Sequence, residues 1–259
     1  MSGRLDGKVA IVTGSDSGIG KAIAIEFGRE GAHVVITWHH DREGAHRTER
    51  EVQAGGGRCV VLQLDVRDPQ EVHRLFRVTH DQLGAPDILV NDAAACGPEK
   101  ETADLSDAEW DDVLKTDLYG PFYCCREFIH SRRAAGGGGK IINITSVHED
   151  LPMYGYAAYD AAQGGLRNLT RTLCLELARD RINVNNIAPG MVLMPESPGA
   201  MDDPAEQEKQ VSRIPLRRAA EPWEIGRLAV YLASGDADYV SGQSFILDGG
   251  LMMSVGQGA

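Results

Sequence analysis

Short apolar runs alternate with longer amphipathic stretches along most of the chain. Seven runs rich in β-branched and other apolar side chains are expected to form strands: Val9–Thr13, His33–Thr37, Cys59–Leu64, Ile88–Val90, Lys140–Ile144, Ile182–Ile187 and Ser244–Leu247. The segments between them have helical spacing of apolar positions: Gly18–Arg29, Arg42–Ala54, Pro69–Leu83, Asp107–Arg133, Tyr156–Arg179 and Pro222–Ala233. The alternation predicts repeated strand–helix–strand units.

Such units build an α/β fold in which helices cover both faces of a parallel sheet. We therefore expect a Rossmann-like, doubly wound sheet of about seven strands. No linker or shift in composition divides the chain, so residues 1–259 are expected to form a single domain. The segment Met191–Ser212 has weak periodicity and contains three prolines, which predicts a mobile loop close to a ligand.

Composition narrows the classes of function. Lys and Arg total 26 against 38 Asp and Glu, a net charge of −12, which argues against nucleic acid and anionic membranes as partners. No apolar run approaches the ~20 residues of a membrane span, and the first residues do not resemble a secretory signal. Five cysteines without CxxC spacing and eight histidines without a ligand pair predict a cytoplasmic, metal-free protein with reduced thiols.

Glycine is over-represented, at 30 of 259 residues, and three glycines fall at one telling place. The segment Val9–Gly20 is expected to be a strand, a glycine turn and the start of a helix, with Gly14, Gly18 and Gly20 where side chains would block close approach. The free N–H groups at the start of such a helix can hold a pyrophosphate. The alternative is a tight turn with no ligand.

Several further motifs occur in order along the chain. They are Thr13-Gly-x3-Gly-Ile-Gly20, Asp65-Val66, Ile144-Thr-Ser-Val-His-Glu149, Tyr159, Asn185-Asn-Ile-Ala-Pro-Gly190 and Leu247-Asp-Gly-Gly250. Together they resemble the short-chain dehydrogenase/reductase family, most of all its bacterial glucose 1-dehydrogenase branch. The resemblance covers nearly the whole chain.

The resemblance implies a nicotinamide cofactor, a small-molecule substrate and a homotetramer. It implies that Tyr159 exchanges a proton with the substrate oxygen and that Ser146 hydrogen-bonds the same oxygen. The cofactor-binding positions it suggests, together with those at the end of the second strand, are Gly14, Ser15, Ser17, Gly18, Ile19, Gly20, His39, Arg42, Asp65, Val66, Asn91, Ala93, Gln163, Pro189, Gly190 and Val192. No metal site is expected.

The chain departs from the family pattern where charge matters. Gln163 stands where the family has a lysine after the tyrosine. Asp92 and Asp117 stand where the family has asparagines, and Met194 stands where it has a threonine. Without the lysine we expect the pKa of Tyr159 to stay near or above 10, so that the tyrosine donates protons better than it accepts them. Reduction is therefore expected to be favoured over oxidation.

Two side chains could compensate for the missing lysine. His148 follows Ser146 by two residues and either supplies acid–base chemistry or lies solvated in a substrate loop. Asp117 and Gln163 either form a hydrogen-bonded replacement for the family's proton relay or lie near one another by packing alone. Both alternatives stay open from the sequence.

Cofactor choice depends on the end of the second strand, where NAD-binding proteins usually carry an acid. Here Thr37-Trp-His-His40 precedes Asp41-Arg42, so no acid stands at the strand end itself. His39 or Arg42 could contact a 2′-phosphate. The sequence thus favours NADP(H) over NAD(H).

Three functions fit these observations. The favoured one is an oxidoreductase that transfers hydride between NAD(P)(H) and a carbonyl or secondary alcohol. The second is a non-redox lyase, dehydratase or isomerase that uses Ser146, Tyr159, His148 and Asp117. The third is a cofactor-binding regulatory protein without catalysis. The substrate stays open, because Ala95-Cys96 replaces the acid expected for glucose.

Overall fold

The computed structural model describes residues 3–193 and 204–254 of the chain. Its strands are β1 (Val9–Val12), β2 (His33–Trp38), β3 (Cys59–Gln63), β4 (Ile88–Asn91), β5 (Gly139–Ile144), β6 (Ile182–Pro189) and β7 (Ser244–Leu247). Its α-helices are α1 (Gly18–Arg29), α2 (Arg42–Ala54), α3 (Pro69–Leu83), α4 (Asp107–Leu114), α5 (Gly120–Ala134), α6 (Ala157–Leu177), α7 (Pro204–Ser212), α8 (Pro222–Ala233) and α9 (Leu251–Ser254). Shorter turns are η1 (Thr102–Asp104), η2 (Lys115–Tyr119), η3 (Val147–Glu149), η4 (Ala178–Asp180) and η5 (Gly235–Ala237).

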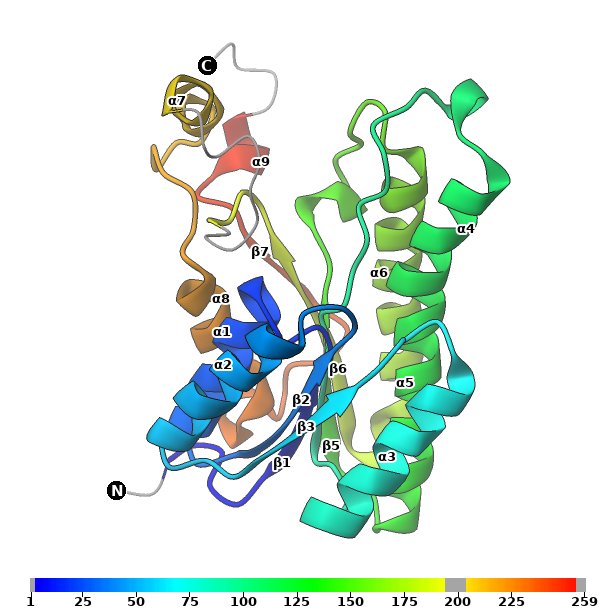
Figure 1. The fold of residues 1–259 in the computed structure, drawn as a ribbon, viewed down its shortest axis with the longest axis vertical. Helices are drawn as coiled ribbons and strands as arrows, with labels where there is room; N and C mark the ends of the chain where they lie inside the picture. Colours follow the sequence, from blue (N-terminus) through cyan, green and yellow to red (C-terminus); the bar gives the residue numbers. More distant parts are fainter. Residues whose placement is uncertain (1–2, 194–203, 255–259) are drawn as a thin grey trace.

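The strands form one parallel sheet in the order β3-β2-β1-β4-β5-β6-β7. Helices α1, α2 and α8 cover one face, and α3, α5 and α6 cover the other (Figure 1). The predicted doubly wound α/β fold of seven strands is confirmed. The chain reverses its direction of winding between β1 and β4, and ligands of such sheets bind beyond the carboxyl ends of the strands at this point.

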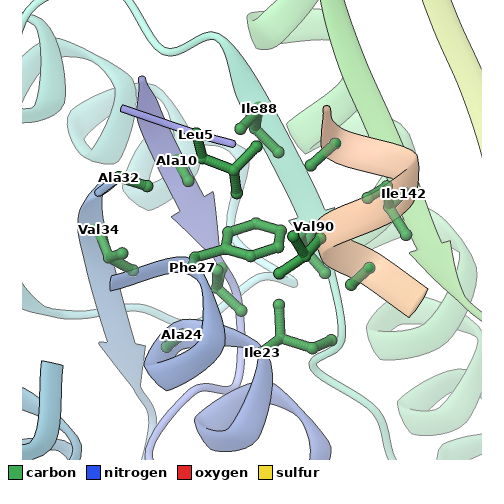
Figure 2. Packing of buried hydrophobic residues seen from close by; sticks show 14 of the residues in the cluster. Leu5, Ala10, Ile23, Ala24, Phe27, Ala32, Val34, Ile88, Val90 and Ile142 are labelled. Atoms are coloured by element: carbon green, nitrogen blue, oxygen red, sulfur yellow. The ribbon is translucent and has the colours of Figure 1, made fainter. Parts of the chain in front are cut away.

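Burial on both faces explains the continuous apolar runs. Along β1, Ala10 and Val12 belong to the core beneath α1 and α8, whereas Ile11 belongs to the core on the opposite face. The first of these cores surrounds the fully buried ring of Phe27 (Figure 2). Side chains on both faces of β1 are buried, so a polar residue would be enclosed on either face. For this reason β1 lacks the alternation of apolar and polar residues that is typical of half-exposed strands.

Two elements differ from the sequence expectation. The expected loop Met191–Ser212 ends in helix α7, whose sequence is rich in the strong helix formers Ala, Glu, Gln and Lys and begins with proline in the first turn. The rest of that prediction, including Met194, lies partly in residues 194–203, outside the described residues.

The expected single helix Asp107–Arg133 is divided into α4 and α5 by η2, a π-helical turn. The N–H of Gly120 bonds the carbonyl of Lys115, five residues earlier, instead of the usual four. Apolar periodicity does not reveal such a turn, because both flanking segments remain helical. The turn carries Asp117, which is buried.

None of the described helices combines the length and apolar character that crossing a membrane would require. All five cysteines are unpaired. Among residues 3–193 and 204–254, no three His, Cys, Asp or Glu side chains gather in a group that could hold a metal ion.

Candidate active site

A cavity of about 580 Å³ lies beyond the carboxyl ends of β1 and β4. Its wall includes the turn after β1, residues Asp92–Cys96 after β4, and the side chains of Asp65 and Tyr159. We call the part around Asp65 the Asp65 end and the part around Tyr159 the Tyr159 end. The cavity therefore occupies the position that the reversal of strand order predicts for a ligand.

The turn after β1 has glycine where any side chain would collide with backbone. A Cβ on Gly14 would lie 2.9 Å from Cα of Ala93, and Gly14 has a positive φ of 64°. A Cβ on Gly20 would lie 2.5 Å from the carbonyl oxygen of Gly14. These glycines let the turn pack closely against Ala93 and against the first turn of the twelve-residue helix α1. The start of this helix, Ser17–Ile19, lines the cavity, which fits a site for a pyrophosphate.

We call the glycine turn and the start of α1 the glycine cradle. A threonine hydroxyl links the two loops that border it. Thr13 Oγ1 accepts the N–H groups of Asp92 at 2.9 Å and of Ala93 at 3.1 Å. The loop after β4 is thereby held against the end of β1. This contact places Asp92 and Ala93 in the cavity wall beside Ser17, Gly18 and Ile19.

Several of the predicted cofactor-binding residues line the cavity: Gly14, Ser17, Gly18, Ile19, His39, Asp65, Val66, Ala93 and Gln163. Ser15, Gly20, Arg42, Asn91, Pro189, Gly190 and Val192 are not in its wall. Ser15 is fully buried and ties β1 to β2, because its hydroxyl donates to the carbonyl of Val12 and accepts the N–H of Thr37. Asn91 donates to Asn143 Oδ1 at 2.7 Å inside the sheet.

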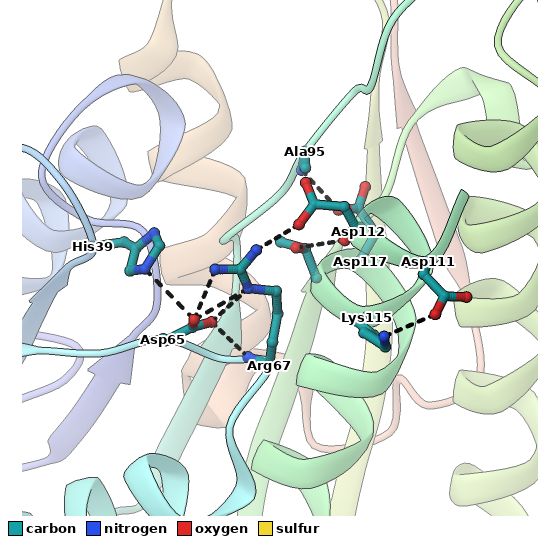
Figure 3. A network of polar contacts seen from close by, with 9 residues as sticks. His39, Asp65, Arg67, Ala95, Asp111, Asp112, Lys115 and Asp117 are labelled. Carbon is teal, nitrogen blue, oxygen red and sulfur yellow. Dashed lines mark hydrogen bonds and ion pairs between the residues drawn. The ribbon is translucent and has the colours of Figure 1, made fainter. Parts of the chain in front are cut away.

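An ion-pair network occupies the Asp65 end (Figure 3). The carboxylate of Asp65 accepts hydrogen bonds from the backbone N–H of Arg67 at 2.9 Å and from its guanidinium at 2.8 Å. The guanidinium also pairs with Asp112 on α4, and His39 Nε2 lies 3.5 Å from the carboxylate of Asp65. These hydrogen bonds from Arg67 lower the pKa of Asp65.

Arg67 was missed by the sequence reasoning, although it lines the cavity and is the only Lys or Arg among the described residues that do. Its position directly after the motif Asp65-Val66 was the feature of the sequence that could have identified it. Its reach across to α4 could not be inferred, because the strand-end motif says nothing about the distance to that helix. The network joins the loop after β3 to α4 over the cavity.

At the Tyr159 end, the structure brings the predicted serine and tyrosine together. Ser146 follows β5, its Oγ accepts the N–H of His148 at 3.2 Å, and its side chain lies beside the Tyr159 side chain on α6. His148 Nδ1 lies 2.7 Å from the carbonyl oxygen of Leu151, and its ring centroid is 6.1 Å from that of Tyr159. The Leu151 contact places the ring proton on Nδ1 and leaves Nε2 as the basic nitrogen.

Burial dominates the titration of Tyr159. Removal from water raises the pKa of its hydroxyl, and the nearby Cys96 and Asp117 raise it further, while the Ser146 hydrogen bond opposes the shift. Tyr159 is therefore protonated at neutral pH. A protonated phenol can donate a proton or a hydrogen bond to a substrate oxygen.

Asp117 and Gln163 form a buried pair beside Tyr159. Gln163 Nε2 donates to Asp117 Oδ2 at 3.1 Å, and the Ala95 N–H donates to Asp117 Oδ1 at 2.7 Å. Burial raises the pKa of Asp117 to about 7, despite these two hydrogen bonds. Gln163 Oε1 is buried and lacks a hydrogen-bond partner, so it is available to a ligand hydroxyl in the cavity.

Asp92 lies in the cradle itself. Loss of hydration raises the pKa of its carboxyl to about 8; the N–H of Gly20 opposes this shift and Asp16 adds to it. At neutral pH the group is mostly protonated and adds little negative charge to a site for phosphates. An ionised Asp92 would oppose a polyanion, and the raised pKa of its carboxyl reduces that obstacle.

A doubly wound sheet with a glycine cradle at its reversal point defines a dinucleotide-binding protein. The family model described as "Enoyl-(Acyl carrier protein) reductase" matches residues 14–252. "Uncharacterized oxidoreductase YohF" of Escherichia coli (strain K12) is 41% identical over 95% of this chain and 96% of its own. "Glucose 1-dehydrogenase 2" of Bacillus subtilis (strain 168) is 33% identical over 96% of each chain.

Solved structures agree with these relatives. Acetoin dehydrogenase from Enterobacter cloacae superposes with a TM-score of 0.89 at 39% identity, over 97% of this chain and 98% of its own. A putative 2-deoxy-D-gluconate 3-dehydrogenase from Agrobacterium tumefaciens, with bound NADP, gives a TM-score of 0.88 at 32% identity, over 96% of this chain and 98% of its own. The chain belongs to the short-chain dehydrogenase/reductase family and is an oxidoreductase of that family.

Proposed function

We propose that this protein uses NAD(P)(H) to interconvert a carbonyl compound and a secondary alcohol, with reduction favoured. The observation that carries the proposal is a protonated Tyr159, with Ser146 beside it, in the wall of the cavity that also contains the glycine turn after β1. Hydride transfer requires the nicotinamide next to the substrate carbon, and a single cavity with both features provides that arrangement.

The residues present fit such a cofactor. Gly14 and Gly18 line the cavity at the start of α1, where the first N–H groups of the helix suit a pyrophosphate, and the unpartnered Oε1 of Gln163 suits a ribose hydroxyl at the Tyr159 end. When bound, the nicotinamide ring supplies or accepts the hydride. Asn91, Pro189, Gly190 and Val192 remain predicted contacts.

In reduction, Ser146 and Tyr159 hold the carbonyl oxygen by hydrogen bonds. The carbonyl carbon receives two electrons and a hydrogen nucleus as hydride, and the phenolic proton of Tyr159 passes to the oxygen, so the product is a neutral alcohol. Solvent then returns one proton to Tyr159. The raised pKa of Tyr159 favours this direction, because a tyrosine that holds its proton is a poor base for alcohol oxidation.

His148 is proposed as a further acid–base group at this end. With its proton on Nδ1 fixed by Leu151, Nε2 accepts a hydrogen bond from a substrate hydroxyl. Asp117 and Gln163 are proposed to replace the family's relay as a hydrogen-bonded pair, on the 3.1 Å contact described above.

We propose NADP(H) as the preferred cofactor over NAD(H). The adjacent rings of His39 and His40 line the cavity at the end of β2, where a ring N–H can donate to a 2′-phosphate. Arg42 lies outside the cavity wall, which leaves the two histidines as the candidates for this contact. Asp41 lines the same region and works against a phosphate. The NADP carried by the Agrobacterium structure supports the proposal.

The test measures binding of NADPH and NADH by calorimetry and then turnover with sugars, quinones, ketones and acetoin. Tighter binding of NADPH and NADPH-dependent reduction are expected. Tight binding without turnover of any of these substrates would favour a non-redox or regulatory role. Absence of binding would refute the proposal outright.

We also propose that residues 1–259 act as one cytoplasmic domain that assembles into a homotetramer. Apolar side chains are exposed on two of the helices that cover the same face of the sheet, among them Leu175 on α6 and Phe122 on α5. Light scattering coupled to size-exclusion chromatography tests the assembly. A monomeric mass would contradict it.

A further inference from the structure

The cavity wall is unusually acidic for a site that binds phosphates. Five aspartates line it, namely Asp16, Asp41, Asp65, Asp92 and Asp112. Among the described residues of the wall, Arg67 is the only one with a permanent positive charge, and its guanidinium is shared by Asp65 and Asp112 at the Asp65 end. No permanent cation therefore faces the Tyr159 end from the described wall.

Asp117 lies directly behind the wall at the Tyr159 end. Only 2% of its surface is exposed, and its two hydrogen-bond donors are neutral groups that belong to wall residues, the N–H of Ala95 and the amide of Gln163. Tyr159 lies on α6 one helical turn before Gln163. The carboxyl of Asp117 is thus separated from the substrate position by one layer of side chains.

The titratable groups that face Asp117 from the loop after β4, from α6 and from α4 are acids or weak acids. Cys96 follows β4, Tyr159 lies on α6, and Asp112 lies on α4, one turn before η2. Within the described chain, Asp117 has no ion-pair partner. Burial and Asp112 raise the pKa of Asp117 to about 7, so its proton exchanges near neutral pH.

The redox state of a nicotinamide changes its charge at this end of the cavity. The reacting ring carbon must lie against the substrate carbon, whose oxygen Ser146 and Tyr159 hold. The oxidised ring carries a positive charge and the reduced ring does not. A carboxylate enclosed in a low-dielectric wall attracts the first and is indifferent to the second.

We propose that Asp117 discriminates between the two redox states of the cofactor: it ionises when the oxidised form binds, and it releases its proton. This inference rests on the proposed function, because it needs the nicotinamide at the Tyr159 end. Preferential binding of the oxidised form makes hydride donation to the substrate more favourable on the protein than in solution. Asp117 thereby acts as a specificity-determining residue for the direction of the reaction.

The test is calorimetric titration with NADP⁺ and with NADPH at pH 7, each in two buffers of different ionisation enthalpy, which reports the protons released on binding. We expect release of up to about half a proton with NADP⁺, because a group with a pKa near the working pH is half protonated, and none with NADPH. In Asp117→Asn, release is expected to vanish. The affinity ratio of NADP⁺ to NADPH should fall about tenfold, as expected for one charge pair ~8 Å apart at an effective dielectric of ~30.

Two further variants make the result specific. Asp117→Asn keeps an acceptor for Ala95, and its N–H₂ takes the place of the oxygen that now faces Gln163 Nε2; rotation of the Gln163 amide brings the unpartnered Oε1 to this N–H₂, so the variant should fold. Asp112→Asn removes a neighbouring charge and should move the pH of maximal release downward. Asp111→Asn, on the exposed side of α4 beside Lys115, is the matched control and should behave as wild type.

The outcomes separate the inference from the proposed function. Binding of both cofactor forms with equal proton release, or release that persists in Asp117→Asn, overturns the inference and leaves the proposed function intact. Binding of neither form overturns the proposed function and the inference with it. Release with the oxidised form alone, abolished by Asp117→Asn, supports both.

Discussion

Two ends of the same cavity hold aspartates in opposite electrostatic settings. At the Asp65 end, the guanidinium of Arg67 lowers the pKa of Asp65, and both groups keep contact with water. At the Tyr159 end, Asp117 is enclosed among neutral partners, and its pKa is raised to about 7. The residue type is the same; the presence of a cation and the degree of burial decide its charge.

The comparison of Asp65 with Asp117 indicates that one end of the cavity has a structural, binding role and the other a role in proton transfer. A permanently ionised, paired acid at the Asp65 end maintains a fixed geometry between β3 and α4 at any physiological pH. An acid with a pKa near neutrality, beside a protonated tyrosine, responds to the charge of what binds there. The four variants below exchange these settings or remove the group that depends on them, beginning with the largest expected effect.

Removing the phenol takes away the proton that the Tyr159 end is built to hold. Tyr159→Phe should lower kcat for carbonyl reduction by about 10²- to 10⁴-fold, the usual contribution of a positioned proton donor. Cofactor affinity should change little, which calorimetry would check. A fully active Tyr159→Phe protein would transfer the role to His148 or another group.

Removing the charge of Asp117 should change how stability depends on pH. The folded-state pKa of about 7 lies above the ~3.9 of an unfolded aspartate, so the stability conferred by this group is complete below about pH 4 and is lost as pH rises to 7. The shift of ~3 units corresponds to about 4 kcal/mol. Wild type should therefore be less stable than Asp117→Asn by about this amount at pH 8 and equally stable near pH 4.

Urea unfolding of both proteins at several pH values measures the difference in the free energy of unfolding. The control is Asp111→Asn, whose carboxylate is exposed and paired with Lys115. Parallel curves for wild type and Asp117→Asn from pH 4 to 8 would show that Asp117 is not buried as an acid.

Gln163→Lys places a cation at the Tyr159 end and makes it resemble the Asp65 end. The ammonium would lie beside Asp117 and hold its carboxylate ionised, and it should lower the pKa of Tyr159 by about 2 units, for a charge ~5 Å away at an effective dielectric of ~20. Alcohol oxidation at pH 8 should rise, and cofactor affinity should increase. A pH profile of oxidation measures the first effect; an unchanged or weaker affinity would contradict the interpretation of position 163.

Arg67→Gln performs the opposite exchange at the Asp65 end. Without the guanidinium, the pKa of Asp65 should return toward its ordinary value, and the affinity for NADPH should fall by up to about tenfold. The free energy of unfolding should change by less than about 1 kcal/mol, because the pair is partly solvated. Arg77→Gln, exposed on α3, is the control. An effect on kcat larger than on cofactor affinity would show that the two ends are coupled.

The fold was predictable because its determinants are local. Both faces of β1 are buried, so the run from Val9 to Val12 is apolar throughout, and Gly14 and Gly20 stand where a Cβ would collide with backbone. The pairing of Ser146 with Tyr159 followed from the family resemblance. Residue type and spacing along the sequence are enough to predict each of these features.

Other parts of the site depend on three-dimensional distances that spacing does not encode. Arg67 reaches α4 only because that helix lies opposite β3, and Ser15 and Asn91 turn out to fasten strands rather than line the cavity. The pairing of Asp117 with Gln163 required the π-helical turn, which left no mark in the apolar periodicity. Helix α7 was missed because its helix-forming residues are polar.

Because of the π-helical turn, the direction in which Asp117 points depends on the number of residues in the turn and not on the type of residue at position 117. Each residue of an α-helix advances the chain by about 100° around the axis, so one surplus residue rotates everything on one side of the turn relative to the other. Deleting a single residue between Lys115 and Tyr119 would restore the regular bonding and turn either Asp117 or the apolar face of α5 away from its present partners. The protonation of Asp117 thus depends on the angular register of a helix. Loss of the Leu118 codon alone would abolish it, although no side chain of the cavity wall would be lost.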